Sequence, residues 1–175
     1  IIIDDNALFR HQEYRKRLLE GEGELTQQEL EAMKNDLAYV KLEGDIGVIG
    51  NGAGLVMATL DTIQYFGGKP ANFLDVGGGA PAEKVSTALK IVLSDPNVKA
   101  LFINILGGIT RCDEVARGIL EAKAKVGVKK PMVIRLVGTN EEEGKQILTK
   151  AGIHVLESME EAAQRVVEVS KHGGK

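Results

Sequence analysis

The fold is set by residues 98–111, which read Val-Lys-Ala-Leu-Phe-Ile-Asn-Ile-Leu-Gly-Gly-Ile-Thr-Arg. An apolar run rich in Leu, Ile and Phe ends at two glycines, and a segment with helical spacing follows. Continuous apolar runs of this length are typical of strands buried on both faces of a parallel sheet. The stretch therefore predicts one strand–loop–helix unit of an α/β fold.

The same arrangement recurs along the chain from about Asp45 onward. Helical patterns separate the strand-like runs, and Asp95-Pro96-Asn97 ends the clearest of these helices. Five such units predict a flavodoxin-like, doubly wound five-stranded parallel sheet with its strand-to-helix loops at one edge. The five strand-like runs are residues 46–49, 72–76, 98–106, 132–137 and 154–157.

Residues 1–44 do not follow this pattern. Ile1-Ile2-Ile3 resembles the tail of a strand with no partner nearby, and a charged, irregular stretch follows it. Thr26…Glu29 forms a capping box that predicts a helix through about Leu37. We interpret residues 1–44 as the end of an upstream domain with an N-terminal helical connector, and residues 45–175 as the flavodoxin-like domain.

Composition excludes several classes of function. Hydrophobic residues are 43%, charged residues 27% and the formal net charge is -3, a balance typical of a globular protein. There is no basic stripe and no Trp, so nucleic acid is not an expected partner. No apolar run is long enough to span a membrane. The single cysteine fits a reducing compartment, and we expect the cytoplasm, or the mitochondrial matrix in a eukaryote.

The predicted helix starts fall into two groups. Thr26, Thr139 and Ser158 each precede a Glu by three residues and predict self-capped helices. Three other helices begin in glycine without such a box, so their first backbone N–H groups would be open to an anion. They follow the first three predicted strands and should meet at the topological switch point. These glycine loops are residues 51–54, 77–81 and 107–110.

Two other interpretations of the glycine loops stay open. Gly52-Ala53-Gly54 with Asp75 about twenty residues later resembles a dinucleotide-binding layout, although Met57 stands where a small residue is expected. The loops could also be tight turns that pack against another chain in a non-enzymatic interaction module.

The chain offers no clear catalytic residue or metal-binding cluster. The three histidines, His11, His154 and His172, do not neighbour a glycine loop. Cys112 lies near a helix start, but we interpret it as a packing residue because no base stands beside it. Arg111 could bind a carboxylate or phosphate, or pair with a neighbouring acid. The sequence thus predicts anion binding without a catalytic group of its own.

Several motifs, in order, resemble the carboxy-terminal part of succinyl-CoA synthetase β subunits. The two long glycine-centred strings are the most specific of them. The matching segments are residues 4–11, 39–47, 51–55, 68–79, 93–95 and 104–113.

The resemblance implies a function that no composition or spacing reveals. The family joins an acid to CoA with cleavage of ATP or GTP, through a phosphohistidine on an α subunit. The β subunit carries an ATP-grasp domain for nucleotide and Mg²⁺, so residues 1–44 would include its tail, with the Mg²⁺ ligands before Ile1. The partner would be that α subunit, in an αβ or α2β2 assembly, with CoA mainly on α.

The resemblance also assigns site residues. Asn51, Gly108, Ile109 and Thr110 correspond to residues that contact the acid or phosphate, and Gly52, Gly107 and Arg111 complete the anion loop. Succinate enzymes usually carry Val where this chain has Thr110. Because a hydroxyl there could bond a 2-hydroxy acid, we expect succinate as the substrate, with malate as the alternative.

Overall fold

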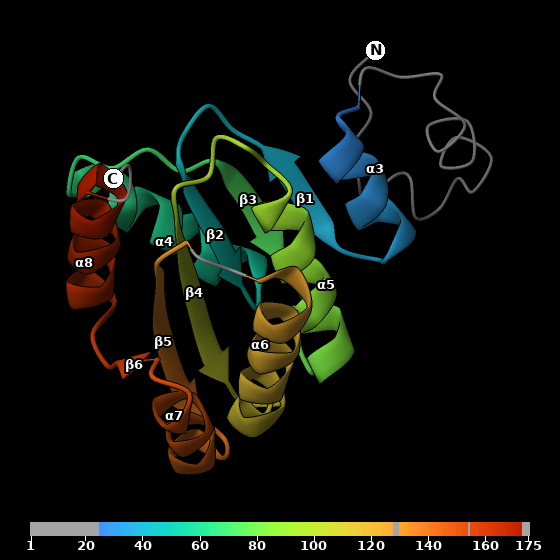
Figure 1. Cartoon of the computed structure of the whole chain (residues 1–175), viewed down its shortest axis with the longest axis vertical. Helices are drawn as coiled ribbons and strands as arrows, with labels where there is room; N and C mark the ends of the chain where they lie inside the picture. The colour runs from blue at the N-terminus through green and yellow to red at the C-terminus, as the bar shows by residue number, and fades with distance from the viewer. Residues whose placement is uncertain (1–24, 128–129, 154, 173–175) are drawn as a thin grey trace.

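The computed structural model describes residues 25–127, 130–153 and 155–172. Helices and strands alternate along the chain (Figure 1). In chain order they are α3 (Gln27–Lys34), β1 (Ala38–Lys41), β2 (Ile46–Gly50), α4 (Ala53–Tyr65), β3 (Asn72–Asp75), α5 (Ala82–Leu93), β4 (Ala100–Gly107), α6 (Cys112–Val126), β5 (Met132–Gly138), α7 (Glu141–Lys150), β6 (Val155–Leu156) and α8 (Met159–His172).

The strands form one sheet in the order β1-β3-β2-β4-β5-β6. The pairs from β3 to β6 are parallel, which confirms the predicted flavodoxin-like, doubly wound sheet. The predicted count of five strands was one short. β1 lies within residues 1–44, interpreted as connector, and pairs antiparallel with β3. With only four residues, β1 is too short to stand out as a strand in the sequence.

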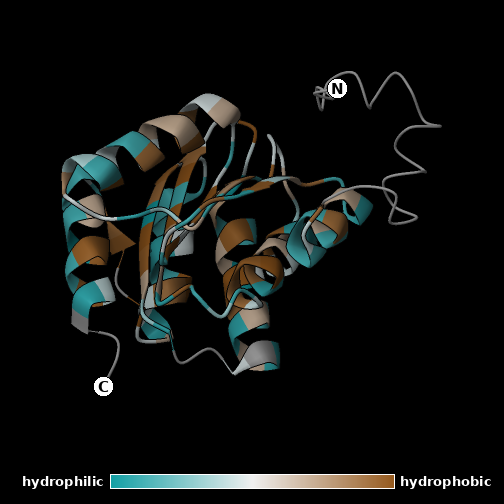
Figure 2. Ribbon diagram, turned by 90° about the horizontal axis from the view of Figure 1, so that it is seen from above, coloured by the Kyte–Doolittle hydropathy of each residue, from teal (hydrophilic) through white to brown (hydrophobic). Residues whose placement is uncertain are grey.

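Helices cover both faces of the sheet (Figure 1). α4 and α8 pack on one face, where the buried cluster includes Phe102 and Val166. α5, α6 and α7 pack on the other, where the cluster includes Ile103 and Leu89. The helices carry hydrophilic residues among their hydrophobic ones (Figure 2), as expected of helices with one face on a sheet. The two-sided burial explains why the strands read as continuous apolar runs.

A polar contact joins α3 to the sheet, because Lys41 N of β1 donates to Glu29 Oε1 (3.3 Å). The predicted capping box is confirmed, since Glu29 Nα donates to Thr26 Oγ1 (3.3 Å) and Thr26 Nα to Glu29 Oε2 (2.7 Å). α3 ends at Lys34, before the predicted Leu37, because Asp36 adopts a left-handed conformation (φ 52°). Lys41 of β1 forms an ion pair with the buried Asp95. Residues 1–24, which hold the rest of the predicted connector, lie outside the described residues.

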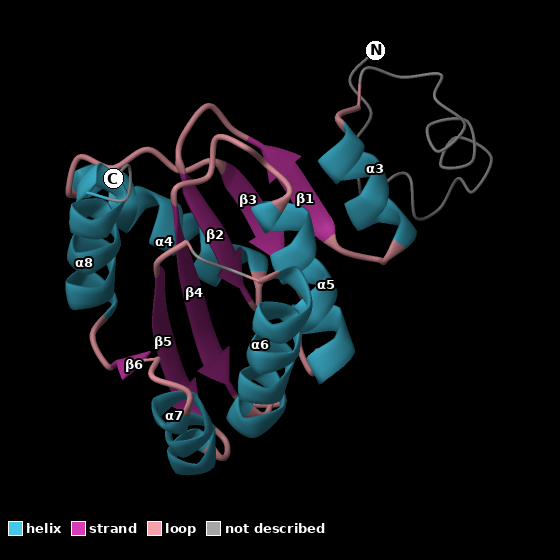
Figure 3. Cartoon of the chain, in the orientation of Figure 1, coloured by secondary structure: helices cyan, strands magenta, loops and turns pink. Residues whose placement is uncertain are grey.

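All parallel strands point in the same direction, and β1 points the other way (Figure 3). The loops that follow β2, β3 and β4 therefore share the carboxyl edge of the sheet. Because β2 lies between β3 and β4, its loop stands between the other two. This edge is where doubly wound proteins bind ligands.

Candidate functional site

The three glycine loops, which were predicted to meet at one edge of the sheet, are joined by hydrogen bonds. Asn51 Nδ2 donates to Leu106 O (2.9 Å), and Leu106 N donates to Asn51 Oδ1 (2.9 Å). Asn51 Nδ2 also donates to Thr110 Oγ1 (3.0 Å). The side chain that follows β2 is thus bound to the end of β4 and to the loop after it.

The start of α4 is occupied by a carboxylate of the protein itself. Gly52, the N-cap, has φ 115° and no side chain with which to cap the helix. Asp75 Oδ1 instead accepts from Gly52 N (2.6 Å) and Gly77 N (2.7 Å). A negative charge at this point is stabilised by the helix dipole. The first loop was predicted to attract an anion, and the anion that it holds here is Asp75.

Asp75 also weakens the dinucleotide interpretation. A dinucleotide would place its pyrophosphate at the start of the first helix after a strand, where the Asp75 carboxylate lies. The earlier objection, that Met57 is too large for helix–strand packing, does not apply because Met57 is half-exposed.

The second loop is likewise satisfied from within. Gly79 N donates to Thr110 Oγ1 (2.9 Å), and Gly77 N is held by Asp75. Pro81, the N-cap of α5, has no N–H to offer. Within this loop, the N–H groups of Gly78 and Ala80 have no acceptor among the described residues, so half of its donors are already engaged.

The third loop keeps its donors. The backbone N–H groups of residues 108–111 have no acceptor among the described residues. Thr139 Oγ1 donates to Gly108 O (2.9 Å). Since the N–H and C=O of a trans peptide point in opposite directions, the Ile109 N–H faces away from Thr139. The Ile109 side chain is 86% exposed, so this loop stands open at the edge of the sheet.

A charged network surrounds the start of α6. Arg111 donates from Nε and Nη2 to the two carboxylate oxygens of Asp113 (3.2 and 3.1 Å), which confirms the predicted pairing with a neighbouring acid. Arg117 Nη1 (2.7 Å) and Asn140 Nδ2 (3.1 Å) donate to the same carboxylate, whose side chain is buried. The Arg111 hydrogen bonds hold the pKa of Asp113 well below its usual range. Asp113 was not predicted as a site residue.

The pKa of Asp113 predicts a pH-dependent effect of Asp113→Asn. A lowered folded-state pKa means that the ionised carboxylate stabilises the fold above its ordinary pKa of about 3.9, and that this stabilisation is lost at lower pH. Asp113→Asn should therefore lower the free energy of unfolding at neutral pH, with a deficit that shrinks below about pH 4. Urea unfolding across pH measures this. Glu114→Gln, which removes a more exposed partner of Arg117, is the control; an equal deficit in both variants would contradict the assignment.

The capping box predicted at Thr139 is wrong, and the one predicted at Ser158 is supported in part. The N-cap of α7 is Asn140, in a left-handed conformation, rather than Thr139. Thr139 uses its hydroxyl for Gly108 instead, and Glu141 Oε2 accepts from Gly138 N (2.8 Å). At α8, Glu161 N donates to Ser158 Oγ as predicted (3.3 Å).

The thiol of Cys112 supplies no nucleophile at these loops. Cys112 is buried, and burial together with Glu141 and Asp113 raises its pKa to about 11. Its place in the buried core cluster confirms the packing role, and a raised pKa does not favour a reactive thiolate. His172 ends α8, while His11 and His154 lie outside the described residues.

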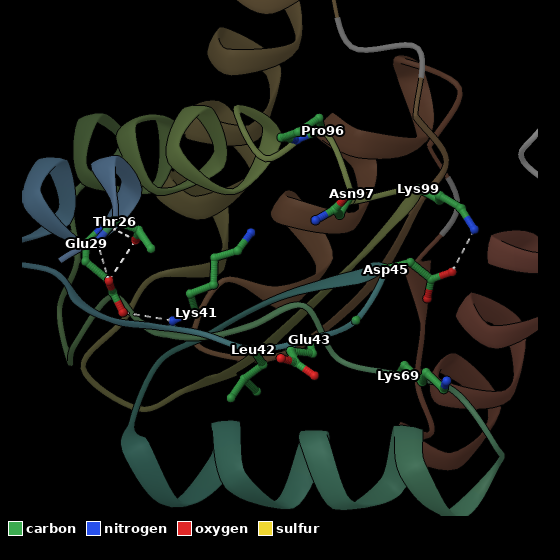
Figure 4. A pocket seen from close by; sticks show the side chains of 11 residues that line it. Thr26, Glu29, Lys41, Leu42, Glu43, Asp45, Lys69, Pro96, Asn97 and Lys99 are labelled. Atoms are coloured by element: carbon green, nitrogen blue, oxygen red, sulfur yellow. Dashed lines mark hydrogen bonds and ion pairs between the residues drawn. The ribbon is translucent and has the colours of Figure 1, made fainter. Parts of the chain in front are cut away.

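A broad hollow of about 840 Å³ lies at the opposite edge of the sheet (Figure 4). Some of its charged side chains have partners within the protein: Lys99 pairs with Asp45 (3.1 Å), and Glu29 Oε1 accepts from the backbone N–H of Lys41 (3.3 Å). It lies at the amino ends of β2 and β4, away from the glycine loops. We therefore place the candidate site at the third loop.

The described residues hold neither a metal-binding cluster nor a membrane-spanning helix. Their His, Cys, Asp and Glu side chains form no group of three or more that could hold a metal ion. Within the same residues, no helix has the length and apolar character needed to cross a bilayer.

Comparison with known proteins gives consistent matches. A family model described as CoA-ligase matches residues 49–169. The succinate–CoA ligase (ADP-forming) subunit beta of Ignicoccus hospitalis is 54% identical over 171 residues, covering 98% of this chain and 45% of that protein. The protein of the same name from Pyrobaculum calidifontis is 55% identical over 172 residues, with the same coverage. The chain spans less than half the length of these relatives.

Solved structures share the fold at low sequence identity. ATP citrate lyase from Methanothrix soehngenii, in complex with citrate and coenzyme A, has a TM-score of 0.70 and 19% identity over 96% of this chain and 48% of that one. The dinucleotide-forming acetyl-coenzyme A synthetase 1 of Ca. Korarchaeum cryptofilum has a TM-score of 0.62 and 20% identity over 93% and 42%. At this identity the likeness concerns the fold alone.

Proposed function

Because the chain belongs to the CoA-ligase family, we propose that it is the CoA-ligase part of the β subunit of a succinate–CoA ligase (ADP-forming). The observation that carries the proposal is 54% identity, over 98% of the chain, to a protein of that name. The open third loop gives it a structural basis.

The proposed reaction divides the chemistry between two subunits. ATP phosphorylates a histidine of the α subunit, the phosphate passes to a succinate carboxylate, and the CoA thiolate then displaces phosphate from the acyl phosphate. This chain contributes fixed donors. The N–H groups of Gly108, Ile109 and Thr110 would hold a carboxylate or phosphate oxygen at the start of α6. Pre-positioned donors of this kind stabilise charge that develops during transfer.

The other proposed site residues have different roles. Asn51 would border the acid beside the third loop, although both of its amide hydrogens are engaged here. Gly107 would start the loop, and Arg111 would direct Nη1, which has no acceptor among the described residues, toward the phosphate. Gly52 is not retained in the anion site, because its N–H is bound by Asp75.

Nucleotide and Mg²⁺ belong, in this proposal, to the upstream part of the β subunit. The described residues of this chain form no group of His, Cys, Asp and Glu side chains that could hold a metal ion. The nucleotide would be ATP, with GTP as the alternative, and CoA would bind mainly on the α subunit. We propose an αβ or α2β2 assembly in the cytoplasm, residues 1–44 as the ATP-grasp tail and connector, and residues 45–175 as the ligase domain.

The Thr110 environment favours succinate over malate as the acid. If malate were the substrate, the hydroxyl of Thr110 would have to contact the hydroxyl of the acid. The side chain is 1% exposed, and its oxygen already accepts two hydrogen bonds, from Asn51 and Gly79. A substrate hydroxyl would have to displace these loops to reach it.

Acid-dependent ADP formation by the full-length β subunit with its α partner tests the proposal. We expect ADP release that requires both CoA and succinate, with malate at least about tenfold poorer in kcat/KM. Equal use of the two acids would refute the choice of succinate. No CoA-dependent release with either acid would refute the proposed function and favour a binding or interaction module.

A further inference from the structure

Thr110 connects its own loop with both neighbouring loops. Its hydroxyl oxygen accepts from Asn51 Nδ2, which follows β2, and from Gly79 N, which follows β3. The residue itself belongs to the loop after β4. Thr110 does not cap a helix, because the N-cap of α6 is Arg111.

Burial separates the Thr110 hydroxyl, unlike the backbone of its loop, from direct contact with a ligand. The residue is 1% exposed, whereas its neighbour Ile109 is 86% exposed. The loop therefore presents its backbone and the Ile109 side chain outward and holds the Thr110 hydroxyl inward. A buried hydroxyl whose oxygen accepts two hydrogen bonds acts through the groups that it holds.

We infer that Thr110 is a positioning residue whose hydroxyl fixes the spacing of the three loops, so that the N–H groups of residues 108–110 face the acid. The inference rests on the proposed function for the identity of the acid. It differs from the expectation that the side chain itself binds substrate.

The other hydrogen bonds among the loops predict which part of the site would change if the Thr110 hydroxyl were lost. Asp75 joins the first two loops without Thr110, and Asn51 binds the end of β4 through Leu106. Loss of the Thr110 hydroxyl would leave these links intact. It would leave the Gly79 N–H and one Asn51 amide hydrogen without the acceptor that links their loops to the third loop. The third loop would move relative to the second while the sheet stays folded.

Steady-state kinetics of Thr110→Val in the full β subunit with its α partner tests this. We expect the KM for succinate to rise at least about tenfold, with the KM for ATP within about twofold of the wild type. Thr110→Ser, which keeps the hydroxyl, should restore most of the succinate KM. An unchanged succinate KM in Thr110→Val, or a Thr110→Ser variant as impaired as Thr110→Val, would overturn the inference.

Thr59→Val is the matched control. Thr59 is also fully buried, and its Oγ1 accepts from Asn104 Nδ2 (2.8 Å), but it lies in α4, outside the loops. It should lower thermal stability without changing the KM for succinate. A rise in that KM equal to that of Thr110→Val would mean that general destabilisation causes the effect, and the inference would fail.

Hydrogen exchange provides a readout independent of activity. In the same complex, Thr110→Val should accelerate exchange of the Gly79 amide, while Thr110→Ser should preserve its protection. Unchanged exchange in Thr110→Val would refute the positioning role. If the wild type forms no acid-dependent ADP, the proposed function fails, and the exchange result alone decides whether Thr110 fixes the loops.

Discussion

Replacing Gly108 with valine is expected to lower succinate- and CoA-dependent ADP formation by about 100-fold or more, because the new side chain would obstruct the third-loop N–H groups. The fold should tolerate it. A Cβ at Gly108 would meet no heavy atom within 4 Å, and the backbone does not require a left-handed residue. Initial rates of ADP formation, with thermal unfolding measured on the same samples, separate loss of the site from loss of the fold.

Gly54→Val is the control for this prediction. A Cβ at Gly54 also meets nothing within 4 Å, but the residue lies in the first turn of α4, where Asp75 already serves the helix start. Its rate should stay within about fivefold of the wild type, since valine is tolerated in a helix at least as well as glycine. If Gly54→Val lost as much activity as Gly108→Val, the anion could not be assigned to the third loop.

The parallel core of the fold could be predicted because burial on both faces leaves a strong pattern. Residues 100–107 form β4, which overlaps the predicted run 98–106 in all but its last residue. β1 could not be predicted in the same way. As an edge strand it has only four residues, and its pairing with β3 depends on tertiary contacts such as the Lys41–Asp95 ion pair.

The position of the candidate site could be predicted from the sequence, but not which of the three loops keeps free N–H groups. Glycine at three helix starts indicates open N–H groups, yet sequence does not reveal which of them the protein satisfies itself. Asp75 serves the first two loops and Thr110 binds the second, so donors remain mainly on the third. Asp75 carried a usable signal, because an Asp followed by glycines often accepts from nearby backbone N–H groups. No such signal pointed to Asp113, because the hydrogen bonds of its buried carboxylate with Arg117 and Asn140 form only in the folded chain.

The largest effect on stability is expected for a substitution where the carboxyl ends of β4 and β5 approach each other closely. Gly138 pairs with Gly107 in the sheet and has φ 123°, a conformation that L side chains rarely adopt. A Cβ there would lie 2.0 Å from Gly107 O. Gly138→Ala should therefore lower the free energy of unfolding by more than about 3 kcal/mol, measured by urea unfolding of the 175-residue chain.

Gly127→Ala distinguishes the close contact from backbone strain. Gly127 also has a positive φ (61°), but a Cβ there meets nothing within 4 Å. Its substitution should cost about 1–2 kcal/mol, the penalty of a left-handed residue alone. The excess cost of Gly138→Ala then measures the contact between β5 and Gly107, which carries the third loop. Equal losses in the two variants would mean that β4 and β5 can separate at this end without cost, and that the loop is not held in place by their pairing.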